Sequence, residues 1–213
     1  MIQSYQYATS ASTAIHWTSA GPLLLVALAV MGSPGPATLS LVAAGSAYGV
    51  RRSFAYLMGI VIGTTAVLFA VATGVTAALL AVPSLRLGLL ATSIVYIGWL
   101  AYNIMTAPPL SQNAAPSRSP SLAGGALLGI ANPKAWIAIA AVFSTASLAE
   151  SAAADAALKL VLLTVMIVLI NGAWLFAGAA LTPLLRAPRP ARIVNVSMAI
   201  LLVAATAFPL IEK

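Results

Sequence analysis

The chain has 213 residues, of which 62% are hydrophobic and only 6% are charged, and its mean hydropathy is +1.04. A soluble globular domain has about 25% charged residues, so this composition excludes one and indicates an integral membrane protein with room for roughly five to seven spans. The net charge of +7 comes from cationic residues scattered between apolar stretches, which is typical of membrane-protein loops and not of a nucleic-acid-binding surface.

Residues 1–21 form a polar stretch that we expect to be a retained N-terminal extension. It contains no Lys or Arg, whereas a secretory signal begins with a basic segment before a short apolar core. The single histidine, His16, falls in this stretch and is interpreted as an interfacial or solvated side chain.

The first apolar stretch, residues 22–44, is interrupted near its middle. Two prolines there free the backbone carbonyls of Val30 and Gly32, and the glycine between the prolines permits unusual backbone angles. One proline would kink a helix, but two predict a break into half-helices, which a membrane tolerates only beside protein or a cavity. The interrupting residues are Ser33, Pro34, Gly35 and Pro36.

The next two spans, residues 54–82 and 87–105, have no such interruption, and a short charged turn from Gly49 to Arg52 precedes the first of them. Residues 106–121 are rich in Pro and Ser and are interpreted as a flexible linker between two halves of the chain. Glycines four residues apart, a spacing that lets helix backbones approach closely, occur as Gly45/Gly49, Gly59/Gly63 and Gly125/Gly129.

A second interruption, Asn132-Pro133-Lys134, lies inside the apolar stretch of residues 122–148. Lys134 is the only ionisable residue near the middle of a long hydrophobic segment. A lysine in that position costs about 2.5–3.5 kcal/mol on the insertion scale. Snorkelling is difficult because Lys134 lies about 18 Å along a helix from Leu122. We therefore interpret this interruption as a functional site and not as a simple proline kink.

A fifth span is expected at residues 158–185 and a sixth at 193–211. Glu150 and Asp155 precede the fifth span and are interpreted as ordinary solvated loop charges. Asn171 is polar at mid-depth, and an interhelical hydrogen bond is favoured over a contact with substrate.

The two halves of the chain match in the position of their interruptions. Pro34 lies eleven residues past Leu23, and Pro133 lies eleven past Leu122, so both are about 16 Å deep in a core of about 30 Å. Three spans per half means that the second half enters from the opposite side. The predicted fold is all-α, with six transmembrane helices as two inverted three-helix repeats (residues 22–105 and 122–213). Helices 1 and 4 are broken near the midplane, a pattern found at transporter sites.

Charge counting predicts the orientation. Loops one, three and five hold six arginines, against three cationic residues on the other side, so we expect those loops in the cytoplasm and both termini outside. The six are Arg51, Arg52, Arg118, Arg186, Arg189 and Arg192, and the three are Arg86, Lys159 and Lys213.

The chain resembles the LysE/RhtB family of bacterial amino-acid exporters in several segments over most of residues 22–145. These are Ser33-Pro34-Gly35-Pro36, Gly49-Val50-Arg51-Arg52, Gly59/Gly63, Tyr96-Ile97-Gly98-Trp99 and Asn132-Pro133-Lys134-Ala135-Trp136. The resemblance implies a bacterial inner-membrane protein that exports amino acids or their derivatives, driven by the proton-motive force. Many relatives have bulky aromatic residues where this chain has residues 137–141, so the size of the pocket does not transfer.

We expect a small-molecule substrate, surrounded by the lipid bilayer, to bind between the two broken helices. Half-helix N-termini and Lys134 would hold its carboxylate. Freed backbone carbonyls, those of Val30, Gly32 and Gly129, would receive its ammonium group together with the Asn132 amide. Lys134 is the candidate carrier of a coupled proton, because the mid-membrane stretches contain no Asp or Glu. The predicted substrate-binding residues are Ser33, Pro34, Gly35, Pro36, Asn132, Pro133 and Lys134.

Other functions are weaker alternatives. A divalent-cation exporter of the same superfamily shape would need oxygen ligands, usually carboxylates, and a central lysine repels cations. The chain has no cysteines, which excludes a thiol electron carrier. An intramembrane enzyme would need a nucleophile with a base, and no such pair occurs at depth. A non-transporting membrane protein is the last alternative. No catalytic residue, metal, cofactor or nucleic-acid partner is expected, and a homo-oligomer is left open.

Overall fold

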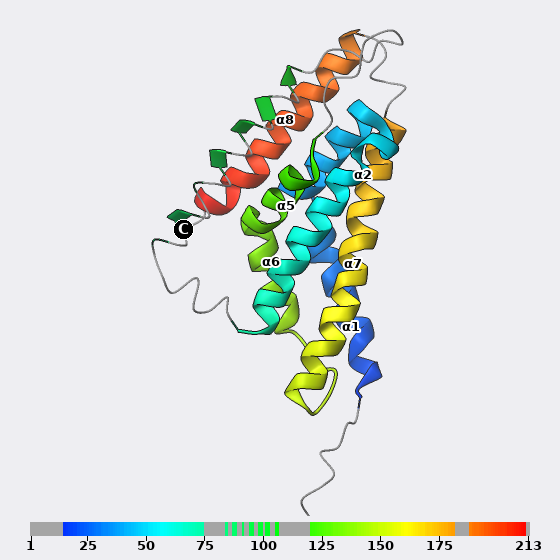
Figure 1. The fold of residues 1–213 in the computed structure, drawn as a ribbon, viewed down its shortest axis with the longest axis vertical. Coiled ribbons are helices and arrows are strands. Elements are labelled where there is room, and N and C mark those ends of the chain that lie inside the picture. Colours follow the sequence, from blue (N-terminus) through cyan, green and yellow to red (C-terminus); the bar gives the residue numbers. More distant parts are fainter. Residues whose placement is uncertain are drawn as a thin grey trace, which may run out of the picture.

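The computed structural model describes residues 15–74, 120–181 and 188–211, together with isolated residues between 84 and 106. Within these ranges the chain is all-α, as predicted, and no strand occurs apart from a single bridge between Ile15 and Ala149. The helices (Figure 1) are α1 (Trp17–Gly32), α2 (Pro36–Ala72), α5 (Leu122–Ala131), α6 (Pro133–Phe143), α7 (Ala152–Ala180) and α8 (Pro188–Ile211).

Gly49 divides α2 into two parts, and the predicted charged turn lies there. Its backbone angles, φ 75° and ψ 169°, are not helical and belong to a region that is essentially restricted to glycine. The buried Ser53 hydroxyl donates to the Ala44 carbonyl across this turn at 2.9 Å. α2 therefore consists of two helical parts joined by the turn at Gly49.

Helix boundaries differ from those predicted at several places. α1 begins at Trp17, inside the expected extension, because the His16 amide donates to the Leu148 carbonyl at 2.8 Å and holds the incoming chain there. α7 begins at Ala152, six residues before the expected start at 158. In the expected third span, the described residues from 87 to 102 are helical, and the others lie outside the described part, as does most of the expected linker.

Close glycine contacts join α2 to its two main neighbours. A Cβ on Gly59 or Gly63 of α2 would collide with the α5 backbone, and one on Gly125 or Gly129 of α5 would collide with the α2 backbone. These two predicted glycine pairs therefore face each other. Gly45 packs in the same way against α7, but its expected partner Gly49 has open space around it and serves the turn instead.

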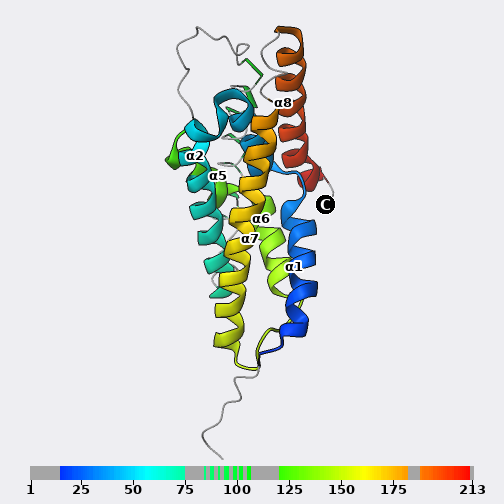
Figure 2. The ribbon, with the colours of Figure 1, turned by 90° about the vertical axis from the view of Figure 1, so that its right-hand side faces the viewer.

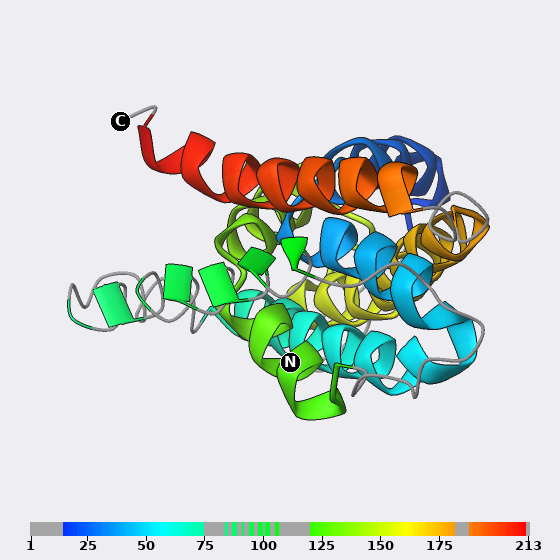
Figure 3. The same ribbon diagram turned by 90° about the horizontal axis from the view of Figure 1, so that it is seen from above.

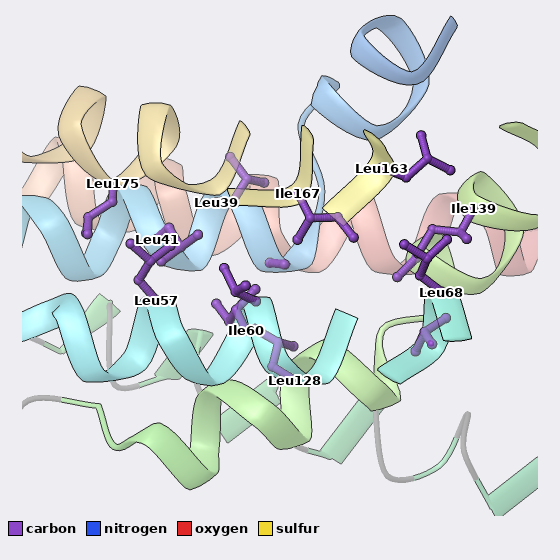
Figure 4. Close-up of a cluster of buried hydrophobic side chains, with 14 of the residues drawn as sticks. Leu39, Leu41, Leu57, Ile60, Leu68, Leu128, Ile139, Leu163, Ile167 and Leu175 are labelled. Carbon is purple, nitrogen blue, oxygen red and sulfur yellow. The ribbon is translucent and has the colours of Figure 1, made fainter. Parts of the chain in front are cut away.

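The hydrophobic core lies between α2, α5, α6 and α7 (Figure 4). α1 packs against both α6 and α7 (Figure 2), and α8 lies against α2 at the edge of the bundle (Figure 3). Fully buried side chains that fill the core include Leu41, Ile60, Leu68, Leu128, Ile139, Ile167 and Leu175.

Two described helices, Pro36–Ala72 and Ala152–Ala180, are long and apolar enough to cross a membrane. α5 and α6 pass the same test together as one span that bends by 58° between them. The composition and these helices agree on a membrane protein.

Candidate functional site

The first break, residues 33–35, separates α1 from α2 where the two prolines predict it. Both carbonyls freed by the prolines already have donors. The Ser33 hydroxyl donates to the Val30 carbonyl at 2.8 Å, and the indole nitrogen of Trp174 in α7 donates to the Gly32 carbonyl at 3.1 Å. These two carbonyls, which we expected to receive a substrate ammonium group, are thus hydrogen-bonded within the protein.

Thr38 caps the start of α2. The Gly35 amide donates to the Thr38 hydroxyl at 2.8 Å, and the hydroxyl donates to the Gly35 carbonyl at 3.1 Å. Pro36 is the first residue of α2, where a missing N–H removes no helical hydrogen bond. The break therefore ends in a well-capped helix whose positive dipole end lies at residue 36.

The second break lies at Asn132, which ends α5 and caps α6. Its side-chain oxygen accepts from the Lys134 amide at 3.1 Å, and Pro133 occupies the first position of α6. The Trp136 indole nitrogen donates to the Ile130 carbonyl at 2.7 Å, back across the bend. The second predicted break is thus confirmed, and an N-cap holds it.

Lys134 joins the two breaks, although they are about 100 residues apart in the sequence. Its Nζ donates to the Ser33 carbonyl and, at 3.3 Å, to the Pro34 carbonyl. A Cβ at Gly35 would lie only 2.6 Å from the Lys134 Cδ, so glycine leaves the space through which the lysine side chain passes. These carbonyls directly follow the C-terminal end of α1, where the helix dipole is negative and favours a cation.

A small cavity lies beside this contact. Its free volume of about 40 Å³ has room for a few water molecules at about 10–15 Å³ each. Three predicted residues, Gly35, Asn132 and Lys134, line it; the others shape the backbone of the breaks. The remaining lining residues are Met31, Ala37, Thr38, Thr64, Ala135, Ala138, Ile139, Ile167, Ile170 and Asn171.

Three polar lining residues, Thr38, Thr64 and Asn171, were not among the predicted site residues. All three are buried. The expected interhelical bond of Asn171 is wrong, because its amide nitrogen donates at 2.8 Å to the Ile167 carbonyl one turn earlier in its own helix. Thr64 lies in the middle of an apolar span, and that polarity at depth was the signal that could have identified it.

A second polar cluster holds α6 and α7 together near the N-terminal end of α7. Lys159 is only 4% exposed, and its Nζ lies 2.8 Å from a carboxylate oxygen of Asp155. The same Nζ donates to the Phe143 carbonyl at 2.8 Å and lies 4.8 Å from the centre of the Phe143 ring. Asp155 also accepts from the Leu148 amide at 2.6 Å. The interpretation of Asp155 as a solvated loop charge is therefore wrong. It belongs to the first turn of α7 because the preceding loop folds back onto that turn.

The family model described as LysE type translocator matches residues 26–212, a range that includes both breaks and Lys134. The chain belongs to the LysE type translocator family. This finding confirms the resemblance read from the sequence motifs, and members of the family are membrane transporters and not enzymes. No curated protein and no solved structure matches the chain. The cavity between the two breaks is the candidate substrate site of this translocator.

Proposed function

We propose that this translocator exports amino acids or amino-acid derivatives across the bacterial inner membrane, driven by the proton-motive force. The observation that supports this most directly is the meeting of two broken helices at Lys134, beside a cavity whose mostly apolar wall includes a few polar side chains. Helix ends inside a membrane protein offer backbone hydrogen-bond donors and acceptors to a polar substrate. Transporters use the ends of broken helices in this way to bind their substrates.

The proposed architecture is six transmembrane helices in two inverted three-helix repeats. α1 with the first part of α2, and α5 with α6, are both broken spans, and they run in opposite directions (Figures 1 and 2). The turn within α2 and the start of α8 lie at the same end of the molecule (Figure 1). Both places have exposed arginines, namely Arg51, Arg52, Arg189 and Arg192. This clustering supports a cytoplasmic location for that end, with both termini on the periplasmic side.

The substrate carboxylate is held by the N-terminal ends of α2 and α6 together with the ammonium of Lys134. Both helix starts present positive dipole ends near the cavity, and charge-assisted hydrogen bonds from a lysine are about twice as strong as neutral ones. Thr38, Thr64 and Asn171 supply neutral hydrogen-bonding groups on the cavity wall. The free space is too small for an amino acid, so the half-helices move apart to admit one.

Lys134 is also the proposed carrier of the coupled proton. Among the residues described as lining the cavity there is no Asp or Glu, and Lys134 is the titratable one. For the proton gradient to drive export, a proton must enter the cytoplasm as substrate leaves it. Lys134 would take up this proton on the periplasmic side and release it on the cytoplasmic side.

Export of a panel of labelled amino acids and dipeptides tests the proposed function. Cells that overexpress the chain should release at least one compound several-fold faster than cells with an empty vector, and an uncoupler that collapses the proton gradient should remove the difference. Cells that express Lys134→Met at equal membrane abundance serve as the matched control and should behave like the empty vector. Equal release by all three strains over the whole panel would contradict the proposal.

A further inference from the structure

The ammonium group of Lys134 occupies a position that suits any primary ammonium group. We propose that the carbonyl oxygens of Ser33 and Pro34 form the subsite for the ammonium group of the exported substrate, and that Lys134 fills this subsite between transport cycles. This inference rests on the proposed function, because it identifies the exported substrate as a primary amine. The ammonium of Lys134 then takes the place of the substrate's ammonium while no substrate is bound.

Two features of the first break make these carbonyls a cation site. The neighbouring carbonyls of Val30 and Gly32 accept hydrogen bonds from neutral donors, a hydroxyl and an indole N–H. The carbonyls of Ser33 and Pro34 instead accept from a cation, the Lys134 ammonium. Both acceptors directly follow the end of α1, so the helix dipole adds to their attraction for positive charge. An ammonium with three N–H donors can bond both carbonyls and keep one donor for a further partner.

The space around the subsite is too small for the Lys134 ammonium and a substrate ammonium at the same time, so one must replace the other. The cavity has room for only a few water molecules while Lys134 is in place, and a side chain at Gly35 would collide with that of the lysine. A substrate that brings a carboxylate and an ammonium can draw Lys134 to its carboxylate and give its own ammonium to the carbonyls. The number of unpaired charges at this depth is then the same before and after binding, which avoids a large desolvation cost.

Chemical rescue of a shortened side chain tests the subsite directly. In the purified full-length chain, Lys134→Ala vacates the two carbonyls, and ethylammonium from solution should fill them. At a concentration ten times its dissociation constant it should raise the Tm of Lys134→Ala by about 3–6 °C. Tetraethylammonium has no N–H donors and should leave the Tm unchanged. The wild-type chain should not respond, because Lys134 already fills the subsite.

Two further variants keep the outcome decisive. Lys134→Met places a side chain of similar length in the same space and should not respond to ethylammonium. If Lys134→Ala does not yield folded protein, Lys134→Ser vacates the subsite in the same way and should show the rise. No rise in the shortened variants, or equal rises with ethylammonium and tetraethylammonium, would overturn the proposal.

The substrate's ammonium is tested in proteoliposomes loaded with a labelled amino acid that the wild-type chain exports. Acetylation of its amino group removes the charge and two donors, so export of the N-acetyl derivative should fall at least tenfold. Equal export of both compounds would overturn this inference while leaving the proposed function intact. If no amino acid is exported, the proposed function fails, and the ethylammonium experiment still decides whether the carbonyls bind ammonium.

Discussion

The buried ion pair between Asp155 and Lys159 should stabilise the translocator measurably. Asp155→Asn keeps the shape of the side chain and its acceptor for the Leu148 amide, but it removes the negative charge. The Lys159 ammonium is then left with the Phe143 carbonyl and ring as partners. The Lys159 side chain is only 5% exposed and that of Asp155 only 16%, so little water can reach the ammonium to replace the lost carboxylate.

The size of the effect follows from this burial. Removing one partner of a buried ion pair costs about 3–5 kcal/mol, because the remaining charge is left without compensation. For a chain of this length, 1 kcal/mol corresponds to about 2–4 °C in Tm, so Asp155→Asn should lower the Tm by about 6–20 °C. The double variant with Lys159→Met has no charge left unpaired and should be more stable than Asp155→Asn alone.

Thermal unfolding of the purified chain, followed by the fluorescence of its four tryptophans, measures both variants. Glu150→Gln is the matched control, since it removes one carboxylate from an exposed position in the preceding loop and should leave the Tm within about 1 °C. An unchanged Tm for Asp155→Asn, or a double variant that is no more stable than Asp155→Asn alone, would refute the reasoning.

Three other predictions address packing, the breaks and orientation. Gly125→Ala should destabilise by about 1–3 kcal/mol, because the new Cβ would meet the α2 backbone; Gly172→Ala, with open space around it, should be neutral or slightly stabilising in the same thermal unfolding assay. Replacing both Pro34 and Pro36 with alanine should let the first span heal into one helix, giving normal membrane abundance by immunoblot with lost export. Unimpaired export would show that the break is not required. A reporter that is active only in the cytoplasm should stay silent when fused after Lys213, and strong activity would reverse the assigned orientation.

Local rules predicted the breaks well. Pro34, Pro36 and Pro133 lack the backbone N–H that an uninterrupted helix would need at these positions, so the sequence alone predicted breaks there. The facing glycine pairs also follow from a local rule, although spacing alone does not say which helices they join. The structure adds that α2 and α5 are those partners.

Contacts between distant segments could not be predicted in this way. Nothing in the spacing of residues shows that Lys134 reaches the Ser33 carbonyl, because this contact depends on how two half-helices pack. The burial of Asp155 and Lys159 was missed for a related reason. Hydropathy places charged residues near a span end in solvent, and only a loop that folds back onto α7 removes them from it.

Lys134→Met is the most direct test of the site. Methionine has a similar length and avoids the insertion cost of about 3 kcal/mol, so the variant should reach the membrane at least as abundantly as the parent. Export should nevertheless fall to background, since methionine cannot bind a carboxylate. Lys134→Arg should not fully restore it, because the wide guanidinium fork does not replace a compact ammonium and does not release its proton. Full export by Lys134→Met at normal abundance would contradict the assignment of the site.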